Sequence, residues 1–370
     1  MMRQKSLMAA ALALSISACQ PPTSDSPPTE PSDDNYQQLL AGQFGDYQQA
    51  NANRLLRFPE DHGAHPDFRM EWWYVTANLE DQLGNWYGVQ WTLFRSGLDG
   101  PKSLGDQRQV YMAHAALSWP GGHHAMQKYA RAGTGQAGVQ NPPFHAWLDH
   151  WQLRSTNKQS WLPLAMTAAD DQFSFDLVLD SDKPLVLQGQ QGFSVKNTQG
   201  SGSYYYSHPY LEVSGKLNID GQSIAVSGSA WLDREWSSQF LLPSQQGWDW
   251  LALHLDDGDK VMIYQLRGQQ LNSADTVKWL SWFDSAGNRK VLTRDFELSA
   301  LEYATVAQRQ IPQRWLIRYG KELTLEATAK QANQWMDLDY PYWEGPVDIS
   351  GSHAGVGYLE MTGYPLGSTD

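Results

Sequence analysis

Short segments of alternating apolar and polar residues, separated by Gly, Pro, Asn and Asp, run through the chain from Glu71 onward. Successive side chains of an extended strand point to opposite faces, so this alternation predicts β-strands buried on one side. Many such strands at even spacing predict an all-β fold of barrels or sandwiches. The clearest segments are 72–79, 86–95, 109–119, 172–180, 204–219, 223–236, 248–255, 260–266, 314–319 and 357–361. One short helix is favoured between Tyr36 and Arg57.

The first 18 residues have the pattern of a secretory signal, because Arg3 and Lys5 precede an apolar run that ends in small residues before Cys19. The run is shorter than the about 20 residues that a membrane-spanning helix needs, so it predicts a signal removed on export. Residues 14–19 resemble the lipobox of bacterial lipoproteins, which implies a lipid on Cys19. In sorted lipoproteins a residue other than aspartate at the next position, here Gln20, implies the outer membrane. We expect a lipid-anchored protein at the periplasmic face; the alternative is an ordinary cleaved signal.

Cysteine usage and charge restrict the chemistry further. Cys19 is the single cysteine of the 370 residues, so a lipidated chain keeps no thiol for a disulfide, a zinc cluster or a nucleophile. The Pro-, Ser- and acid-rich residues that follow predict a semi-rigid spacer. The formal charge is −13, and it becomes −15 when Arg3 and Lys5 leave with the signal. Such an acidic chain is not expected to bind nucleic acid.

A weak internal repeat suggests how the strands are grouped. In both 72–95 and 248–267, an aromatic-led strand ends at Leu and two acidic residues, turns, and returns to an Arg. A period near half the folded length predicts two related β-domains. The predicted organisation is a signal peptide at 1–18, a tether with a short helix at 19–53, an N-terminal domain at 54–240 and a C-terminal domain at 241–370.

Several motifs occur together after Leu55. They are 58–66 leading into Glu71-Trp72-Trp73-Tyr74, then 91–95, Met112-Ala113-His114-Ala115, Tyr206-Ser207-His208-Pro209, 231–236 and 357–364. This set resembles the AttH-like proteins, which are grouped with carotenoid 1,2-hydratases and described as predicted secreted hydrolases. The resemblance implies two consecutive lipocalin-like, calycin-type antiparallel β-barrels and an apolar ligand. For some members it also implies association with an ABC transporter permease.

The Asp220-Gly221 pair predicts a two-residue type I′ turn between two of the strands. In a regular hairpin the numbers of paired residues then sum to 441, so Tyr210 faces Trp231, His208 faces Asp233 and Tyr206 faces Glu235. The face that carries Leu211, Val213, Leu217 and Ile219 against Ala230, Val226 and Ile224 is apolar and is predicted to be core. The other face brings an imidazole beside two carboxyl groups.

This polar face predicts an acid/base cluster in which Asp233, Glu235, His208 and Tyr206 are the catalytic residues. Opposed side chains have Cβ atoms about 4.5 to 5.5 Å apart. Burial raises the pKa of a carboxyl group and a neighbouring carboxylate raises that of an imidazole, so one group can hold a transferable proton near neutral pH. The alternative is a solvated face with a structural His208–Asp233 pair. Pro209 cannot donate to the ladder, and a bulge there would slip the pairing by one residue and separate these groups.

The comparison with the hydratases bears on Asp233 in particular. The resemblance implies that, in the hydratases, an aspartate in a Tyr-His-Asp-His-Asn-like strand protonates a carbon–carbon double bond. Asp233 matches it, but the flanking histidines become Leu232 and Arg234 and the asparagine becomes Glu235. Arg234 alternates away from Asp233 along the strand, but a guanidinium close by would keep carboxylates ionised and make Asp233 a poorer acid. This departure argues against carotenoid hydration itself and leaves another acid/base reaction on a lipid-like substrate open.

Aromatic side chains are the candidates for ligand binding, since Trp and Tyr combine a large apolar surface with one polar tip. The chain contains 17 Trp and 17 Tyr. The candidate ligand-binding residues are Trp72, Trp73, Tyr74, His114, Tyr210, Trp231, Trp236, Trp248 and Trp250. The alternative for these residues is core packing, and for His114 a hydrogen-bonded core histidine.

The remaining motifs give little support for a particular function. Asp61, His62, His65 and Asp67 have metal-ligating side chains, but their loop offers no rigid element to fix ligand geometry, so we expect it to pack against Glu71 without a metal. Residues 133–138 fit G-x-G-x-x-G but precede two prolines rather than a helix, which excludes a phosphate loop. No G-x-S-x-G, H-E-x-x-H or P-loop sequence occurs, and no cofactor is expected.

Three functions therefore remain open at the level of the sequence. The favoured one is a periplasmic acid/base enzyme of hydratase or hydrolase type that acts on an apolar substrate. The second is a non-catalytic lipid or small-molecule carrier associated with an ABC transporter. The third is a carbohydrate-active enzyme, because paired carboxyl groups beside aromatic platforms also occur in glycosidases.

Overall fold

The computed structural model describes residues 47–98, 108–239, 241–268 and 275–367. These residues form 23 β-strands and one short 3-10 helix, η1 (Glu60–His62), and no α-helix. The predicted signal peptide, Cys19 and most of the predicted tether lie outside them. One short helix was predicted between Tyr36 and Arg57; 36–46 also lies outside the described residues, and 47–57 contains no helix. No helix in the described residues is long and apolar enough to cross a bilayer.

The chain divides into two units, Met1–Ser32 and Asp33–Asp370, and all strands belong to the second unit. Its first sheet is antiparallel, with the order β4-β3-β2-β1-β13-β12-β9-β8-β7-β6-β5 and with β10 and β11 paired to β12. The strands of this sheet are β1 (Met70–Asp81), β2 (Trp86–Gly97), β3 (Gln109–Trp119), β4 (Gly122–Arg131), β5 (Ala137–Gln140), β6 (His145–Leu148), β7 (Trp151–Ser155), β8 (Leu164–Ala169), β9 (Phe173–Asp180), β10 (Val186–Leu187), β11 (Phe193–Val195), β12 (Gly202–Ile219) and β13 (Gln222–Ser237).

The second sheet is also antiparallel, with the order β17-β16-β15-β14-β23-β22-β20-β19-β18 and with β21 paired to β22. Its strands are β14 (Gln245–Leu255), β15 (Lys260–Gly268), β16 (Val277–Phe283), β17 (Arg289–Thr293), β18 (Glu297–Val306), β19 (Arg309–Tyr319), β20 (Leu323–Ala329), β21 (Trp335–Met336), β22 (Tyr342–Gly351) and β23 (Gly355–Met361). All ten segments predicted as strands lie on strands of the two sheets. The first sheet thus ends at Ser237 and the second begins at Gln245.

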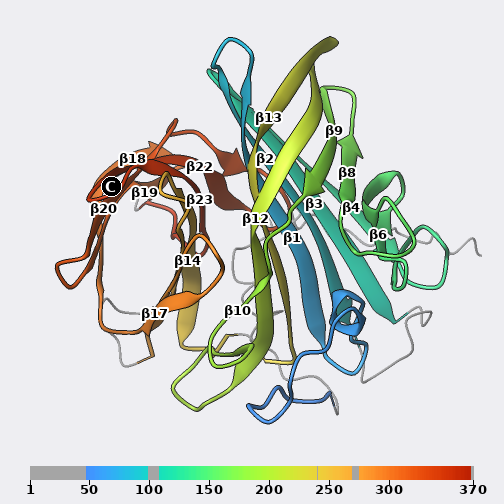
Figure 1. Ribbon diagram of the computed structural model, residues 1–370, viewed down its shortest axis with the longest axis horizontal. Coiled ribbons are helices and arrows are strands. Elements are labelled where there is room, and N and C mark those ends of the chain that lie inside the picture. The colour runs from blue at the N-terminus through green and yellow to red at the C-terminus, as the bar shows by residue number, and fades with distance from the viewer. Residues whose placement is uncertain (1–46, 99–107, 240, 269–274, 368–370) are drawn as a thin grey trace, which may run out of the picture. The chain divides into compact units, whose positions relative to one another are not determined.

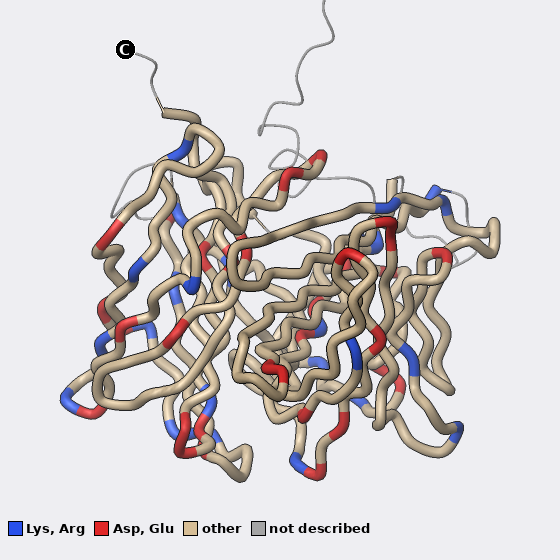
Figure 2. Tube along the Cα trace, turned by 90° about the horizontal axis from the view of Figure 1, so that it is seen from above, with Lys and Arg blue, Asp and Glu red and all other residues tan. Residues whose placement is uncertain are grey.

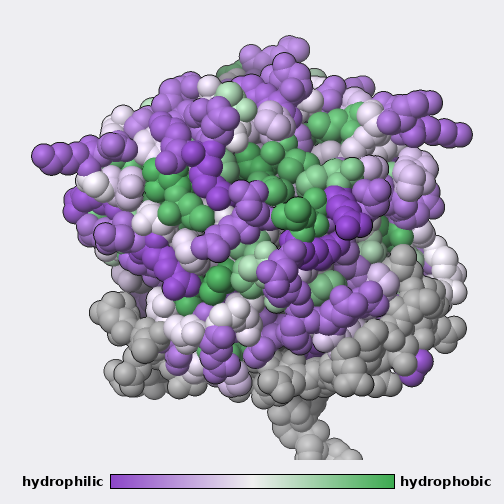
Figure 3. Space-filling view, turned by 60° about the horizontal axis from the view of Figure 1, so that its bottom comes forward, coloured by the Kyte–Doolittle hydropathy of each residue, from purple (hydrophilic) through white to green (hydrophobic). Residues whose placement is uncertain are grey.

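The two sheets curve to different degrees and lie side by side (Figure 1). The first is a nearly closed barrel, in which β6 near one end of the sheet contacts β2, β3 and β4 near the other end. The second is a half-barrel. The prediction of an all-β protein with two consecutive antiparallel, lipocalin-like domains is confirmed. Many charged residues lie at the turns between strands (Figure 2), and one face shows apolar side chains among polar ones (Figure 3).

Three apolar clusters hold this arrangement together. The largest fills the first barrel and includes Trp73, Trp91 and Trp151, all almost fully buried. A second cluster lines the concave side of the half-barrel around Trp343. The third lies between the sheets, where Trp231 of β13 packs with side chains of β14 and β15. Burying large aromatic groups against each other removes much apolar surface from water, which makes the contact between the sheets part of the core.

The β12–β13 hairpin has the predicted turn but not the predicted register throughout. Asp220 and Gly221 have φ angles of 50° and 79°, as a type I′ turn requires. Pairing follows the predicted sum from Ile219↔Gln222 to Leu211↔Ala230. The predicted apolar face also packs in the first barrel, with Ile224 only partly buried. Between Leu211 and His208 the register shifts by one residue, at the position of Pro209, because proline has no N–H to give to the ladder.

The pairing predicted beyond this bulge is therefore wrong. Asp233 is opposed by Ser207 and Glu235 by Tyr205, whereas His208 faces Leu232 and Tyr206 faces Arg234. Since a slip of one residue exchanges the two faces of a strand, Tyr206 and His208 turn to the opposite side of the sheet from Asp233.

Candidate functional site

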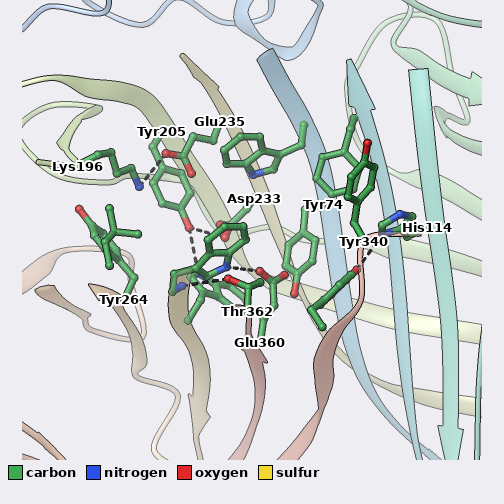
Figure 4. A pocket seen from close by; sticks show the side chains of 16 residues that line it. Tyr74, His114, Lys196, Tyr205, Asp233, Glu235, Tyr264, Tyr340, Glu360 and Thr362 are labelled. Carbon is green, nitrogen blue, oxygen red and sulfur yellow. Dashed lines mark hydrogen bonds and ion pairs between the residues drawn. The ribbon is translucent and has the colours of Figure 1, made fainter. Parts of the chain in front are cut away.

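A pocket lies between the two sheets, outside the core of either, and side chains from both sheets line it (Figure 4). The first sheet contributes Trp72, Tyr74, His114, Tyr205, Asp233 and Glu235. The second contributes Trp248, Trp250, Tyr264, Leu266, Tyr342 and Glu360. Trp72, Tyr74, Asp233 and Glu235 reach it because they alternate with Trp73 and Arg234, which point into the first barrel. The pocket combines aromatic walls with several carboxyl groups.

Asp233 is the most elaborately held of these carboxyl groups. The Ser207 hydroxyl donates to its Oδ1 at 2.5 Å and Trp231 Nε1 donates to the same oxygen at 2.7 Å. The Tyr205 hydroxyl donates to Oδ2 at 2.5 Å and itself accepts from Trp250 Nε1 of the second sheet at 3.2 Å. Both oxygens are thus oriented by neighbours, and the side chain is only 2% exposed.

Burial raises the pKa of Asp233 to about 7, although the hydrogen bonds from Ser207, Tyr205 and Trp231 act in the opposite direction. The negative charge of Glu235 raises the pKa further. Removing a carboxylate from water favours its neutral form when no cation is at hand. A protonated carboxyl group is consequently available here near neutral pH.

Glu235 has a different environment, because it is the carboxyl group that carries a counter-ion. Lys196 Nζ lies 2.7 Å from Glu235 Oε1, and the ammonium group sits over the rings of Tyr205 and Tyr264 at 4.8 and 4.2 Å. The Ser203 hydroxyl also donates to Glu235. The Lys196 ammonium group thus places a positive charge directly against this carboxyl group. Two carboxyl groups of β13 that are two residues apart are therefore in contrasting surroundings.

Two further carboxyl groups come from the second sheet and were not among the predicted site residues. Glu360 of β23 lines the pocket and accepts a hydrogen bond from Trp248 Nε1. Glu344 of β22 stands directly opposite Glu360 and accepts one from the Tyr74 hydroxyl at 2.5 Å. Burial raises the pKa of Glu360 to about 7, and burial together with the charge of Glu360 raises the pKa of Glu344 well above its usual range.

His114 completes the pocket wall on β3. Its Nδ1 lies 3.1 Å from the Tyr342 hydroxyl, and its ring stacks on that of Tyr342. Burial lowers the pKa of the imidazole to about 3, so it is neutral at physiological pH. Among the described residues, its buried Nε2 has no hydrogen-bond partner. A ligand in the pocket could satisfy this atom.

The predicted ligand-binding residues divide into two groups. Trp72, Tyr74, His114, Trp248 and Trp250 line the pocket. The remaining four do not. Trp73 and Trp236 belong to the core of the first barrel, and Trp231 packs between the sheets, where it supports Asp233. Tyr210 lines a separate pocket, and its hydroxyl donates to the Asp284 backbone carbonyl.

The predicted catalytic residues divide in the same way. Asp233 and Glu235 are brought together in the pocket, but Tyr206 and His208 lie inside the first barrel as a result of the bulge at Pro209. The Tyr206 hydroxyl bonds with His62 Nδ1 at 2.7 Å, and burial lowers the pKa of His208 to about 4. Tyr205 and Ser207, one residue earlier on the strand in each case, take the predicted places beside the carboxyl groups.

The loop at 60–67 packs against Glu71, as predicted. His65 bridges Asp61 and Glu71 through its ring nitrogens, at 3.0 and 3.2 Å. Arg95 and Arg234 both form ion pairs with the fully buried Glu71. Arg234 therefore belongs to this cluster on the opposite face of β13 from Asp233, and it does not lower the pKa of Asp233. In the part of the chain that the structure describes, no group of three or more His, Cys, Asp or Glu is arranged to hold a metal ion.

The fold and this site define a class of antiparallel β-proteins with two lipocalin-like domains and an acidic, aromatic pocket between them. The chain belongs to the AttH-like family, whose sequence model matches residues 49–364. This confirms the resemblance found in the sequence. No match to the chain was found among curated protein sequences.

Solved structures give the same picture. A protein assigned as AttH, NE1406 of Nitrosomonas europaea, is 36% identical, with a TM-score of 0.77 over 86% of this chain and 99% of its own. Kievitone hydratase of Nectria haematococca is 14% identical, with a TM-score of 0.67 over 88% and 98%. The protein CghA is 13% identical, with a TM-score of 0.53 over 88% and 98%. At these low identities the last two show a shared fold.

Proposed function

We propose that this protein is an acid/base enzyme of the hydratase or hydro-lyase type, with an apolar alkene as its substrate and Asp233 as its proton donor. The observation that carries the proposal is the buried Asp233 carboxyl group, held on both oxygens and with its pKa raised to about 7 beside aromatic walls. An acid whose pKa lies near the working pH is well matched to general acid catalysis.

The reaction would begin with transfer of the Asp233 proton to one carbon of a carbon–carbon double bond. A C–H bond forms, and the other carbon becomes electron-deficient. The aromatic rings of Trp248, Trp250 and Tyr74 and the carboxyl groups that line the pocket would stabilise a positive centre there. Water then adds to that carbon and gives up a proton, so the product is an alcohol. Run in reverse, the same steps remove water from an alcohol.

The hydratase function has support from the family and from one neighbour. Asp233 matches the position to which proton donation is assigned in the hydratases that the sequence resembles. Kievitone hydratase, whose name describes such a reaction, shares the fold. The apolar character of the substrate follows from the pocket, where Trp, Tyr, Phe and Leu side chains dominate the lining.

Conversion of a panel of isoprenoid alkenes and of kievitone by the purified protein tests this proposal. Asp233→Asn keeps the shape of the side chain but removes its acid, so it should slow alcohol formation at least 100-fold. Glu212→Gln, on an exposed part of the same hairpin, is the matched control and should retain the activity. Equal rates for wild type and Asp233→Asn would reject the role of Asp233.

A non-catalytic carrier is the second candidate, because the aromatic lining would also bind a lipid without altering it. Association with an ABC transporter permease belongs to this candidate and follows from the family resemblance. Native mass spectrometry of the purified protein would detect a retained ligand. A bound lipid that is unchanged by wild type, with equal affinity for Asp233→Asn, favours the carrier; a bound sugar would favour the carbohydrate-active alternative.

We also propose that the protein is anchored at the periplasmic face of the outer membrane through a lipid on Cys19. The support is the signal-like segment, the lipobox-like residues before Cys19 and the residue Gln20 after it. Membrane fractionation tests this, since Cys19→Ser should move the protein from the membrane fraction to the soluble periplasmic fraction. A Cys19→Ser protein that stays in the membrane fraction would refute lipid anchoring.

A further inference from the structure

The two sheets follow one plan around the pocket. β1 lies between β2 and β13 in the first sheet, and β14 lies between β15 and β23 in the second. Beyond β13 come β12 and β9, and beyond β23 come β22 and β20. The hairpins β1–β2 and β14–β15 are those in which the sequence repeat was found. The repeat is therefore a repeat of architecture as well as of sequence.

The strand registers fix which residues correspond. Trp72 opposes Phe94 in the first hairpin, and Trp248 opposes Leu266 in the second, so these pairs align. Two residues further on, Tyr74 then aligns with Trp250. On the neighbouring strand, Tyr74 is opposed by Asp233, and Trp250 is opposed by Glu360.

Asp233 and Glu360 thus hold corresponding positions in the two halves of the site, and both side chains line the same pocket. Each is opposed on its next strand by a polar partner, Ser207 for Asp233 and Glu344 for Glu360. Each also receives an indole N–H, from Trp231 and from Trp248 respectively. The two carboxyl groups are close enough for their charges to interact.

The charge around the pair limits how many of these groups can be ionised together. The residues facing Glu360 are Glu344 on β22, Asp233 and Glu235 on β13, Tyr74 on β1 and Trp248 on β14. Among the described lining residues, Lys196 is the one Lys or Arg, and it is paired with Glu235. Without a cation for either, ionisation of one member disfavours ionisation of the other.

We propose that Glu360 is a second catalytic residue, the base that accepts the proton released by the water as Asp233 donates its own to the alkene. This inference rests on the proposed hydratase function. In the forward direction the Asp233 O–H bond breaks and a C–H bond forms; the water O–H bond breaks, a C–O bond forms, and Glu360 gains the proton. The pair retains one proton in total, and transfer from Glu360 to Asp233 restores the starting state.

The roles of Asp233 as acid and Glu360 as base can be distinguished by incubating each variant with an isoprenoid alkene in D₂O and measuring deuterium exchange and alcohol formation. Glu360→Gln retains the acid, so it should still exchange solvent deuterium into the recovered alkene while it forms alcohol at least 100-fold more slowly than wild type. Asp233→Asn should lose both exchange and alcohol formation. Glu212→Gln is the control for both. Because Gln resembles a protonated Glu, the Glu360→Gln protein should fold, which its thermal unfolding verifies.

Several outcomes would overturn the assignment. If Glu360→Gln forms alcohol within threefold of the wild-type rate while Asp233→Asn is inactive, the catalytic role of Glu360 is rejected. The proposed hydratase function is then unaffected. Loss of both deuterium exchange and alcohol formation in a folded Glu360→Gln protein also contradicts a role as base. If wild type forms no alcohol from any probe alkene, the proposed function itself fails, and the role of Glu360 fails with it.

A titration without substrate supplies an independent measure. Infrared spectra of the protonated carboxyl groups, recorded against pH, should show the pKa of Glu360 falling below about 7 in Asp233→Asn, because the neighbouring negative charge is gone. An unchanged pKa would mean that the two groups do not share a proton, and would also overturn the proposal.

Discussion

The Tyr74 hydroxyl of the first sheet donates a hydrogen bond of 2.5 Å to Glu344 Oε1 of the second. The crossing is matched in the other direction by Trp250, whose indole donates to the Tyr205 hydroxyl at 3.2 Å. Tyr74 and Trp250 are corresponding residues of the two hairpins, so each sheet sends an aromatic side chain from the same position into the other half of the site. These two bonds link the two walls of the pocket.

Removal of the first crossing bond should weaken the protein. Tyr74→Phe leaves the apolar contacts with Trp250 in place but takes a donor from a buried carboxyl group, which should lower the free energy of unfolding by about 1 to 2 kcal/mol. Urea unfolding followed by tryptophan fluorescence measures this. Tyr303→Phe, on an exposed tyrosine of β18, is the control and should change stability little. Equal stability of the two variants would show that the crossing bond contributes nothing.

Two adjacent tyrosines test the observed register of β12. Tyr205→Phe removes a hydrogen bond that lowers the pKa of Asp233, so this pKa should rise above about 7. Tyr206→Phe removes the bond to His62 inside the first barrel and should leave Asp233 unaltered. Infrared titration of the Asp233 carboxyl group in both variants decides between them. A larger effect from Tyr206→Phe would restore the unbulged register that the turn alone predicts.

Asp233 should also make stability depend on pH. An unfolded aspartate has a pKa of about 3.9, and the folded pKa is raised to about 7. Between these values the folded chain binds more protons, so its free energy of unfolding falls as the pH rises through this window, by up to about 4 kcal/mol. Asp233→Asn has no carboxyl group at this position, so its free energy of unfolding does not undergo this decrease. Its stability relative to wild type should therefore increase from pH 4 to pH 7 and then level off.

Thermal unfolding of wild type and Asp233→Asn at a series of pH values measures that difference. Using the difference cancels the contributions of groups that do not interact with Asp233, among them buried histidines such as His62. A difference that is constant from pH 4 to pH 8 would mean that the Asp233 carboxyl group titrates normally in the folded protein.

The Glu71 cluster should matter for stability but not for the pocket. Glu71→Gln leaves Arg95 and Arg234 buried without their counter-charge, which should cost about 3 to 5 kcal/mol. Glu326→Gln, which breaks a partly exposed pair with Arg314, should cost less than about 1 kcal/mol. Urea unfolding compares the two. A small cost for Glu71→Gln would show that the buried guanidinium groups find other partners.

Local patterns in the sequence were sufficient for ten of the strands and for the turn at Asp220-Gly221, because alternation and turn chemistry act over a few residues. They were not sufficient for the register near Pro209. A turn determines pairing only as far as the ladder stays regular, and the missing N–H of one proline moved His208 and Tyr206 to the other face. The same proline was the signal that could have corrected the prediction.

The contribution of the second sheet to the site was harder to predict. Glu344 and Glu360 are far from Asp233 in the sequence, and nothing local indicates that the two sheets meet at these residues. The repeat at Trp72 and Trp248 was the available signal. Combined with the strand order, this repeat gives Glu360 in the second sheet the position that corresponds to Asp233 in the first.

Asp233 and Glu360 are buried because the two sheets pack against each other around the pocket. Their raised pKa values therefore depend on both sheets being present. Cleaving the polypeptide between β13 and β14 and separating the two fragments would expose both walls of the pocket to solvent. Asp233 and Glu360 would then revert to ordinary carboxylates, and each fragment would be a β-sheet protein without acid chemistry.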